Sequence, residues 1–450
     1  MKFSSLLRIF IAIAFLGLGF TSTLSAQSFI TVGKQPLAII PVGNTVHVFC
    51  NGDDKNFNSI YEPDSGDVAA SWWVIDAQTH SVLKHREFTD RYLPFPFRSV
   101  VTEQFTYFPN GNHLSRFLTS TQELDVDKLI VLPDSLGQIY AVSKPNSNPI
   151  FTLSSRKNYG TPGYIIGVDV VAPAILGVFQ TLINTQQTLD FVTSDHNSFL
   201  AVLNEGGFGA NNSTLQIFGK NFENTVLPMG DAGNHIYYQG DGSDSLFVTV
   251  NGSHKVLIID VLKKEIVKSI PTQTTGYNGP RESVVIGNKL FVTTYNSDVR
   301  EFDIETGNLI ATLDSKGKPE GLTVINGKLW VANEYEKNSY TDYGNTVAIF
   351  DSPLAVEEYF TENKNMVFPN PARVSATFST TFNGHSNTPV TIEIYSLSGA
   401  KLFSVNTTSG NNGEVNYVLP LHANNLPTGT YFVRLSASNN VQTTRLTVAE

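Results

Sequence analysis

Three similar strand patterns recur in the second half of the chain, and this repeat limits the folds that the chain can adopt. Apolar residues dominate six positions in each copy, at Leu246–Asn251, Leu290–Tyr295 and Leu329–Glu334. A second apolar run follows each copy and ends in an acid, at Asp260, Asp303 and Asp351. The copies start at 246, 290 and 329, which are 44 and 39 residues apart. Because this length accommodates four short strands with their turns, we expect one four-stranded antiparallel sheet per repeat.

The N-terminal segment supplies a strand that the last repeat lacks. Gly33–Cys50 has the same order of strand, turn and strand as Gly317–Asn333, in which Asn326-Gly327 is a strong hairpin signal. The last repeat has only three predicted strands before Pro353, and Phe29–Val32 precedes the first repeat as a spare strand. We therefore predict that this N-terminal strand completes the last sheet and closes a ring, which removes two open sheet edges.

The predicted fold class is all-β, with a seven-bladed β-propeller over 27–352 closed by the N-terminal strand. At about 43 residues per blade, this segment has room for between seven and eight blades. The long polar loop at 51–70 uses part of that length, so seven is preferred. Between 95 and 195 the sequence predicts strands at 128–132, 138–142, 164–171 and 175–179, but it does not assign them to blades.

Composition and charge exclude several classes of protein. Hydrophobic residues make up 41% of the chain and charged residues 16%, which indicates a folded core and argues against disorder. The net charge of −10 gives no basic surface, so we do not expect nucleic acid as a partner. Cys50 is the single cysteine, which excludes an internal disulfide framework and is expected to be buried at a strand end.

The two ends of the chain carry separate signals. Residues 1–26 combine Lys2 and Arg8 with an apolar run and a small-residue exit, as a secretory signal peptide does. The apolar run is short for a membrane span, so no transmembrane segment is expected in the mature chain. Residues 353–364 are a predicted linker. Several alternating strands in 365–450 then predict a small Ig-like β-sandwich.

The repeats resemble YVTN-type β-propellers. The resemblance lies in Leu329-Trp-Val-Ala-Asn333 and in second runs that end in an acid such as Asp303. Leu203–Thr214 is also similar to a stretch in a subgroup of secreted propellers. The match covers 196–352 well and 29–87 fairly, and it does not extend securely over 95–195.

The C-terminal segment resembles the type A sorting domain of the type IX secretion system. Its matching motifs are Phe368-Pro-Asn-Pro371, Val390–Gly399, Leu426–Arg434 and Arg445-Leu-Thr-Val448. Arg445 departs from the lysine that is more frequent in such domains, although the charge is kept. The resemblance implies that the type IX machinery recognises 365–450, exports the protein and removes this domain. The mature protein would then be attached to the outer cell surface or released.

The expected strand order places two sets of loops on one face of the ring, and this face is the candidate ligand-binding site. Aromatic rings can stack on a small polar ligand or glycan there, while amides and carboxylates fix its orientation. The ligand itself is not predicted. The candidate contacts are Asn204, Glu205, Phe208, Asp231, Asn234, Arg281, Tyr295, Glu320, Asn333, Glu334 and Tyr335. Further residues expected on the same face are Arg98, His254, Tyr277 and Asn296.

No motif in the sequence predicts catalytic residues, metal ligands or a cofactor. There is no HExxH pair and no G-x-S-x-G elbow. Asp241–Asp244 is interpreted as a hairpin turn, and the acidic loop with Asp53, Asp54, Asp64 and Asp67 as solvated surface. Two alternatives to a ligand-binding protein stay open. One is a lactonase-like hydrolase whose metal would be held by Glu205, Asp231, Glu320 and Glu334, and the other is an adhesin or scaffold that acts through its rim.

Overall fold

The computed structural model describes eleven segments of the chain. These are residues 28–58, 60–89, 98–144, 150–219, 223–240, 243–351, 367–382, 386–395, 401–421, 426–437 and 440–449. They divide into two compact units, one within 1–353 and the other within 354–450. Both units are all-β, with a short 3-10 turn at Pro63–Ser65. The predicted signal peptide (1–26) and linker (353–364) lie outside the described residues.

The described part of the first unit contains seven four-stranded antiparallel sheets, numbered here in chain order. Sheets one and two consist of β2 (Pro36–Val42), β3 (Thr45–Cys50), β4 (Ala70–Asp76), β5 (Val82–Phe88), β6 (Val100–Val101), β7 (Phe105–Asn110), β8 (His113–Leu118) and β9 (Leu124–Val131). Sheets three and four consist of β10 (Gln138–Ser143), β11 (Ile150–Arg156), β12 (Pro162–Asp169), β13 (Ala174–Ile183), β14 (Thr185–Val192), β15 (Ser198–Asn204), β16 (Ser213–Phe218) and β17 (Asn224–Gly230).

The predicted repeats form the last three sheets. Sheets five and six consist of β18 (Gly233–Tyr238), β19 (Ser245–Val250), β20 (Lys255–Asp260), β21 (Glu265–Pro271), β22 (Pro280–Ile286), β23 (Lys289–Thr294), β24 (Asp298–Asp303) and β25 (Leu309–Asp314). Sheet seven consists of β26 (Gly317–Ile325), β27 (Lys328–Glu336), β28 (Tyr343–Asp351) and β1 (Ser28–Thr31). The strands expected between 95 and 195 fall within β9, β10, β12 and β13, so the structure assigns them to sheets two and three.

Sheet seven joins the two ends of the first unit. β1 pairs antiparallel with β28, with Ser28 opposite Ile349 and Thr31 opposite Thr346. The Val32 N–H donates a further hydrogen bond to the Asn345 carbonyl at 2.8 Å. The buried side chains of Ile30 and Val32 belong to the same apolar cluster as those of Val347 and Ile349. The N-terminal strand therefore contributes core side chains as well as ladder hydrogen bonds.

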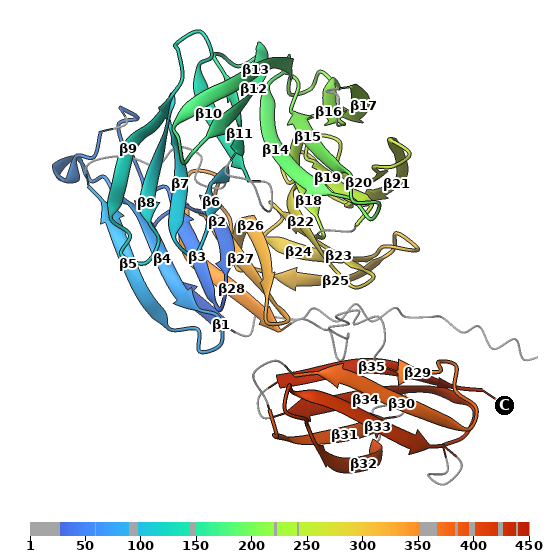
Figure 1. Cartoon of the computed structure of the whole chain (residues 1–450). Helices are drawn as coiled ribbons and strands as arrows, with labels where there is room; N and C mark the ends of the chain where they lie inside the picture. The colour runs from blue at the N-terminus through green and yellow to red at the C-terminus, as the bar shows by residue number, and fades with distance from the viewer. Residues whose placement is uncertain are drawn as a thin grey trace, which may run out of the picture. The chain divides into compact units, whose positions relative to one another are not determined.

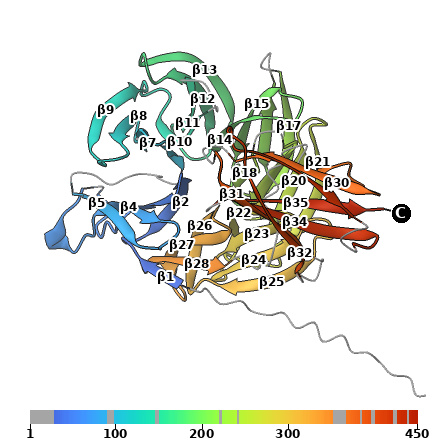
Figure 2. The same cartoon turned by 60° about the horizontal axis from the view of Figure 1, so that its bottom comes forward.

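The seven sheets follow one another around a common centre, as Figures 1 and 2 show. The first strand of each sheet lies nearest the centre and the fourth lies outermost (Figure 1). β2 of sheet one contacts β26 of sheet seven. Aromatic side chains fill the space between sheets one and two, where the ring of Phe49 meets that of Phe108 edge-on at 4.9 Å. This arrangement is consistent with a β-propeller.

The local turn chemistry agrees with the sequence. Asn326 and Gly327 connect β26 to β27 with φ angles of 51° and 70°. A two-residue hairpin turn requires positive φ at both positions, which asparagine and glycine tolerate best. Cys50 is fully buried and unpaired, as expected for a lone cysteine at a strand end. The strand order also places the start of each first strand beside the end of each second strand, and the candidate site lies at this end of the sheets.

The second unit consists of two sheets around one apolar core. The described strands are β29 (Val367–Phe368), β30 (Ser375–Thr381) and β33 (Glu414–Pro420) in one sheet, and β32 (Lys401–Thr408), β31 (Pro389–Tyr395), β34 (Gly429–Ala437) and β35 (Asn440–Val448) in the other. Buried Phe378 comes from the first sheet and buried Ile392 from the second, so the two inner faces share the core. Every strand predicted from the alternation in this segment is present.

Candidate functional site

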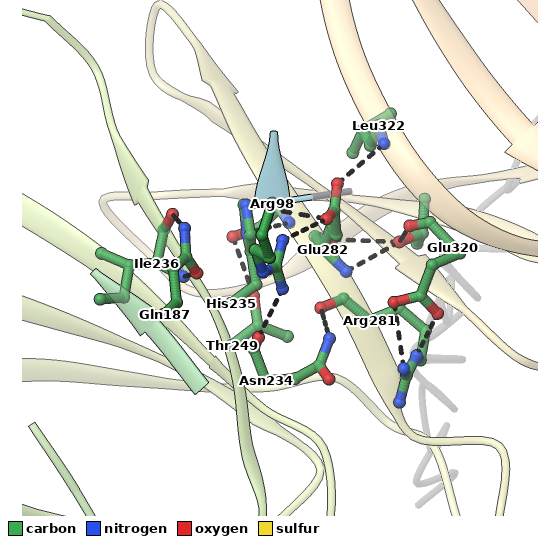
Figure 3. Close-up of polar contacts among 12 residues, drawn as sticks. Arg98, Gln187, Asn234, His235, Ile236, Thr249, Arg281, Glu282, Glu320 and Leu322 are labelled. Atoms are coloured by element: carbon green, nitrogen blue, oxygen red, sulfur yellow. Dashed lines mark hydrogen bonds and ion pairs between the residues drawn. The ribbon is translucent and has the colours of Figure 1, made fainter. Parts of the chain in front are cut away.

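A buried ion pair lies where sheets two, five and six meet (Figure 3). Arg98, just before β6, donates from Nη1 to Glu282 Oε1 at 3.1 Å and from Nη2 to the Asn234 carbonyl at 2.9 Å. Glu282, in β22, accepts a second hydrogen bond at Oε2 from the Leu322 N–H at 3.1 Å. Both partners are nearly inaccessible to solvent, with side-chain exposures of 5% for Arg98 and 9% for Glu282. With these hydrogen bonds the pair links sheets two, five, six and seven, and both charged groups are almost fully buried.

A second pair lies beside the first, and in it the arginine is partly exposed (21%) while the acid is buried (3%). Arg281 forms a bidentate ion pair with Glu320, from Nε to Oε2 at 2.5 Å and from Nη2 to Oε1 at 3.0 Å. The Tyr295 hydroxyl donates to Glu320 at 3.0 Å and contacts the Glu334 carboxylate. Gln35 donates to the other oxygen of Glu334 at 3.2 Å, which brings the N-terminal segment into the network. We call Arg98, Glu282, Arg281, Glu320, Tyr295, Glu334 and Gln35 the central network.

Burial and like charge raise the pKa values of the acids in the central network. Burial raises the pKa of Glu282 to about 7, although the Arg98 charge opposes the rise. Burial and the neighbouring Glu320 carboxylate also raise the pKa of Glu334. Burial disfavours the charge on Arg281, but the Glu320 carboxylate outweighs it and holds the pKa of that guanidinium above its usual range. The network therefore keeps Arg281 charged while Glu282 and Glu334 tend toward the neutral form near pH 7.

Tyrosine rings cover one side of the central network. Tyr335 stacks on Tyr343 at 5.4 Å and meets Tyr295 edge-on at 5.9 Å. Tyr340 lies on the loop after β27, with its side chain 46% exposed, and the Lys318 ammonium lies 4.0 Å from its ring centroid. These contacts order a set of aromatic rings at the end of sheet seven.

A second group of aromatic and charged residues lies on the same end of sheets three and four. Arg156, at the end of β11, reaches Glu205 at 3.5 Å and lies 4.0 Å from the centroid of the Tyr140 ring. Its Nε has no hydrogen-bond partner among the described residues. The Phe208 N–H donates to the Tyr159 hydroxyl at 3.1 Å. We call Arg156, Tyr140, Glu205, Tyr159 and Phe208 the second cluster.

Burial raises the pKa of Glu205, and the charges of Arg156 and Arg281 oppose that rise. Asp231 lies close enough to raise it further, and its own carboxylate accepts a hydrogen bond from the Gly209 N–H at 2.7 Å. Glu205 follows the second strand of sheet four, and Arg281 lies at the start of the first strand of sheet six, so the second cluster and the central network lie at the same end of their sheets.

Two predicted contacts point into their own sheets. Asn204 is 1% exposed, and its amide donates to Gln216 at 3.1 Å while its oxygen accepts from Thr185 at 3.0 Å. Asn333 is equally buried and donates to the Ser315 carbonyl at 2.8 Å. Successive side chains of a strand point to opposite faces, so the neighbouring Glu205 and Glu334 take the other direction. These two asparagines hold strands together and do not reach the candidate site surface.

The other predicted residues vary in exposure. Asn234 is buried and donates to the Arg281 carbonyl at 2.8 Å, so it supports the ion pair from behind. His254 contacts the Thr274 hydroxyl at 2.9 Å. Tyr277 is 78% exposed and Phe208 is 58% exposed, which leaves both rings available to solvent. Asn296 is exposed.

The four carboxylates considered for a metal are divided among different partners. Glu320 pairs with Arg281 and Glu334 with Tyr295, while Glu205 pairs with Arg156 and Asp231 accepts from a backbone N–H. No group of three or more histidine, cysteine, aspartate or glutamate residues in the described ranges is arranged to hold a metal ion. The geometry therefore gives the metal-dependent alternative no specific support.

In the acidic loop of sheet one, Asp67 differs from its prediction as solvated surface, whereas Asp64 is exposed as predicted. Asp67 is 7% exposed and accepts hydrogen bonds from the N–H groups of Lys55 and Glu62, at 2.9 and 2.8 Å. This carboxylate organises the loop from within, because it satisfies backbone donors that would otherwise be unpaired. Asp244 accepts two hydrogen bonds from Ser194, 50 residues away, and so joins the β14–β15 connection to the β18–β19 connection. Asp241 and Gly242 lie outside the described residues.

Sequence reasoning missed several residues of this site. Glu282 follows Arg281 directly but was not selected, and Arg156 lies in the stretch that was not assigned to blades. Alignment of β22–β23 with β26–β27 places Arg281 at the position of Glu320 and Glu282 at that of Gly321, so the repeat gives no signal for Glu282. For Arg156 we find no signal either, because its partners come from other strands.

Comparison with known protein families identifies the second unit. Residues 366–449 match the family described as secretion system C-terminal sorting domain. Two of its motifs meet in the structure, because the Asn370 side chain accepts a hydrogen bond from the Thr447 N–H at 2.8 Å. The match supports a protein secreted through the type IX system to the cell surface.

No curated protein shows significant sequence similarity to the chain. None of the described residues forms a helix with the length and apolar character that a membrane crossing requires.

Proposed function

We propose that the protein is a YVTN-type, seven-bladed β-propeller, closed by its N-terminal strand, that binds an extracellular ligand through one loop face. The pairing of β1 with β28 and the contact of β2 with β26 support closure. The repeated strands in sheets five to seven support the family resemblance. The signal peptide at 1–26 and the sorting domain at 365–450 would both be removed during export.

The proposed ligand is a glycan or a small polar molecule. The observation that carries this proposal is the presence of exposed aromatic rings beside the paired charges, with Tyr159 57% and Tyr340 46% exposed. A sugar ring can stack on such faces, while the partly exposed guanidinium of Arg281 offers donors for its hydroxyl groups. The buried part of the central network would hold these groups in place.

Binding can be tested by calorimetric titration with cello-, malto-, xylo- and chito-oligosaccharides. Tyr340→Ala and Arg281→Ala should each weaken the binding of the same oligosaccharide about tenfold or more, because one loses a stacking face and the other a charged donor. Leu262→Ala is the matched control, since Leu262 is an exposed residue in the turn after β20, at the opposite end of the sheets. Failure of every oligosaccharide to bind, or equal affinity in all variants, would contradict the glycan proposal.

The closure proposal has its own test. Deletion of residues 27–32 removes β1 and the buried side chains of Ile30 and Val32. Burial of two such side chains contributes about 3–6 kcal/mol, and the deletion also exposes the ladder edge of β28. We expect a sharp fall of the melting temperature in calorimetry. An unchanged melting curve would count against closure.

Export can be tested separately from binding. Removal of residues 365–450 should leave the protein in the periplasm, because the type IX machinery would no longer recognise it. Fractionation of cells that express the full chain and the truncated chain measures this. Normal surface display of the truncated protein would exclude a sorting role for this unit.

A further inference from the structure

A cleft of about 590 Å³ lies between sheets three and four, away from the candidate site described above. Its walls are mostly apolar side chains of β11, β12 and β13 on one side and of β15 and β16 on the other. The principal apolar lining residues are Ile150, Ile165, Leu176, Phe179, Phe199 and Phe218. Both its volume and its apolar walls are typical of sites for small molecules.

Two facing glycines explain why the cleft is not filled by the protein itself. Gly167 of β12 is directly opposite Gly177 of β13. The adjacent pair on the same face, Ile165 and Phe179, reaches across toward sheet four, where the Phe179 ring meets Phe218 at 5.3 Å. A Cβ atom at either glycine would meet no atom within 4 Å. The two sheets are therefore in contact at Phe179 and separate beside the glycines.

The inner end of the cleft is polar. Asp190 of β14 accepts hydrogen bonds from Ser143 at 2.5 Å and from Thr152 at 3.4 Å. Burial raises the pKa of Asp190, and these two hydroxyl groups oppose the rise. Among the described residues no lysine, arginine or histidine forms an ion pair with it. A partly buried carboxylate without a cation is unusual, because a buried charge normally has a partner of opposite sign.

We propose that this cleft binds a single-chain amphiphile whose protonated primary amine pairs with Asp190 and whose apolar chain lies against Ile165 and Phe179. The cation would supply the charge that the protein does not place beside Asp190. The cleft extends from the inner strand β14 to the outer strand β13, about three strand spacings or about 14 Å, which a chain of about ten carbons spans.

The length of the cleft and the charge of Asp190 argue against three other occupants. A lysine side chain of another protein has a stem of four carbons, about 6 Å long, and would not reach Asp190 from the open edge at β13. A fatty acid of suitable length would place its carboxylate against that of Asp190, where like charges repel. A second copy of the chain could pair with the apolar outer edge of β13, but that contact would leave Asp190 without a cation.

The test uses the full chain and decylamine as the probe, with decanol and decanoate of equal length as comparisons, below their micelle concentrations. Calorimetric titration should show one decylamine per chain, with decanol bound about tenfold more weakly and decanoate more weakly still. Asp190→Asn should weaken decylamine about tenfold and leave decanol unchanged. Equal affinity for all three compounds, or no binding of decylamine, would overturn the proposal.

A second pair of variants locates the site. Gly177→Phe should abolish the binding of both decylamine and decanol, because the ring occupies the cleft. Gln180→Phe adds the same ring to an exposed position of β13 that does not line the cleft, and it should bind as the unchanged protein does. If decylamine binds Gly177→Phe normally, its site is elsewhere. Self-association that this variant abolishes, without decylamine binding to the unchanged chain, would assign the cleft to contacts between copies instead.

Discussion

The central network and the cleft between sheets three and four both contain buried carboxylates, but these carboxylates have different partners. Glu282 in the network faces Arg98 and also accepts a backbone N–H, so each of its oxygens has a partner. Asp190 in the cleft has two hydroxyl donors and no cation among the described residues. The network is complete within the protein and supports the fold. The cleft leaves a charge that an external cation can pair with.

The two sites differ because different sheets contribute their side chains. Sheets two, six and seven bring charged side chains together, where Arg98 pairs with Glu282 and Arg281 pairs with Glu320. Sheets three and four present apolar residues and two glycines to each other, with a single acid at the inner end. Substitution of the arginine in a buried ion pair leaves an unpaired buried charge, which lowers the free energy of unfolding. Substitution of a buried acid that has no cation by a neutral residue leaves no unpaired charge behind. The following predictions test this distinction, from the largest expected effect to the smallest.

Arg98→Met should produce the largest effect. The substitution leaves Glu282 buried without its cation, which typically costs about 3–5 kcal/mol of unfolding free energy. Denaturant unfolding at pH 8 measures this loss. Lys263→Met is the control, because Lys263 also pairs with an acid, Asp260, at 2.8 Å, but is 64% exposed. A similar small change in both variants would show that the network does not stabilise the fold.

The pH dependence of stability should follow from Glu282. Its pKa is raised from 4.5 to about 7, so between these values the folded protein holds a proton that the unfolded chain has released. This contribution is complete below about pH 4.5 and is lost as the pH rises to about 7, up to about 3 kcal/mol. Glu282→Gln removes it, so the unchanged protein should lose stability relative to the variant over this range.

His47 also contributes to the pH dependence of the unfolding free energy, so the profile of the unchanged protein alone does not isolate the contribution of Glu282. Burial lowers the pKa of His47 to about 4, so its contribution rises with pH up to about 6.5 and opposes that of Glu282. The difference between the unchanged protein and Glu282→Gln cancels this contribution, because both contain His47. Parallel stability profiles for the two proteins from pH 4 to 8 would contradict the assignment.

Asp190→Asn should have a smaller effect of opposite sign to that of Arg98→Met. Asparagine can accept a hydrogen bond from Ser143 at its oxygen and donate one to the Thr152 hydroxyl from its NH2 group, and it removes a charge that burial disfavours. We expect the unfolding free energy at pH 8 to stay unchanged or to rise by about 1 kcal/mol. Asp125→Asn, which breaks the ion pair with Arg116, is the matched control. A loss of several kcal/mol would show that Asp190 has a structural role.

Gly177→Val should give the smallest effect, a gain of about 0.5–1 kcal/mol. Valine suits a strand better than glycine does, and a Cβ atom at this position meets nothing within 4 Å. Gly233→Val is the contrasting variant, because a Cβ atom there would lie 2.5 Å from Ser213 Oγ and should destabilise the protein. Thermal unfolding of both variants tests whether the cleft is open. Equal destabilisation would indicate that the space at Gly177 is already occupied.

The sequence by itself determined the strands. The alternation in Leu246–Asn251 and its copies, with Asn326-Gly327 between β26 and β27, is a local signal, because side-chain direction and turn type depend on neighbouring residues. The sorting domain was equally readable, since its motifs are contiguous. The same alternation shows that Asn204 and Glu205 cannot both face the loop surface.

The tertiary structure decided which strand ends meet. Arg98 and Glu282 are 184 residues apart, and nothing local to either indicates the other. Their contact depends on the packing of all seven sheets around one centre, as does the separation of sheets three and four at Gly167 and Gly177. Side-chain periodicity is fixed within a few residues, whereas the partner of a buried charge is fixed only when distant sheets pack together.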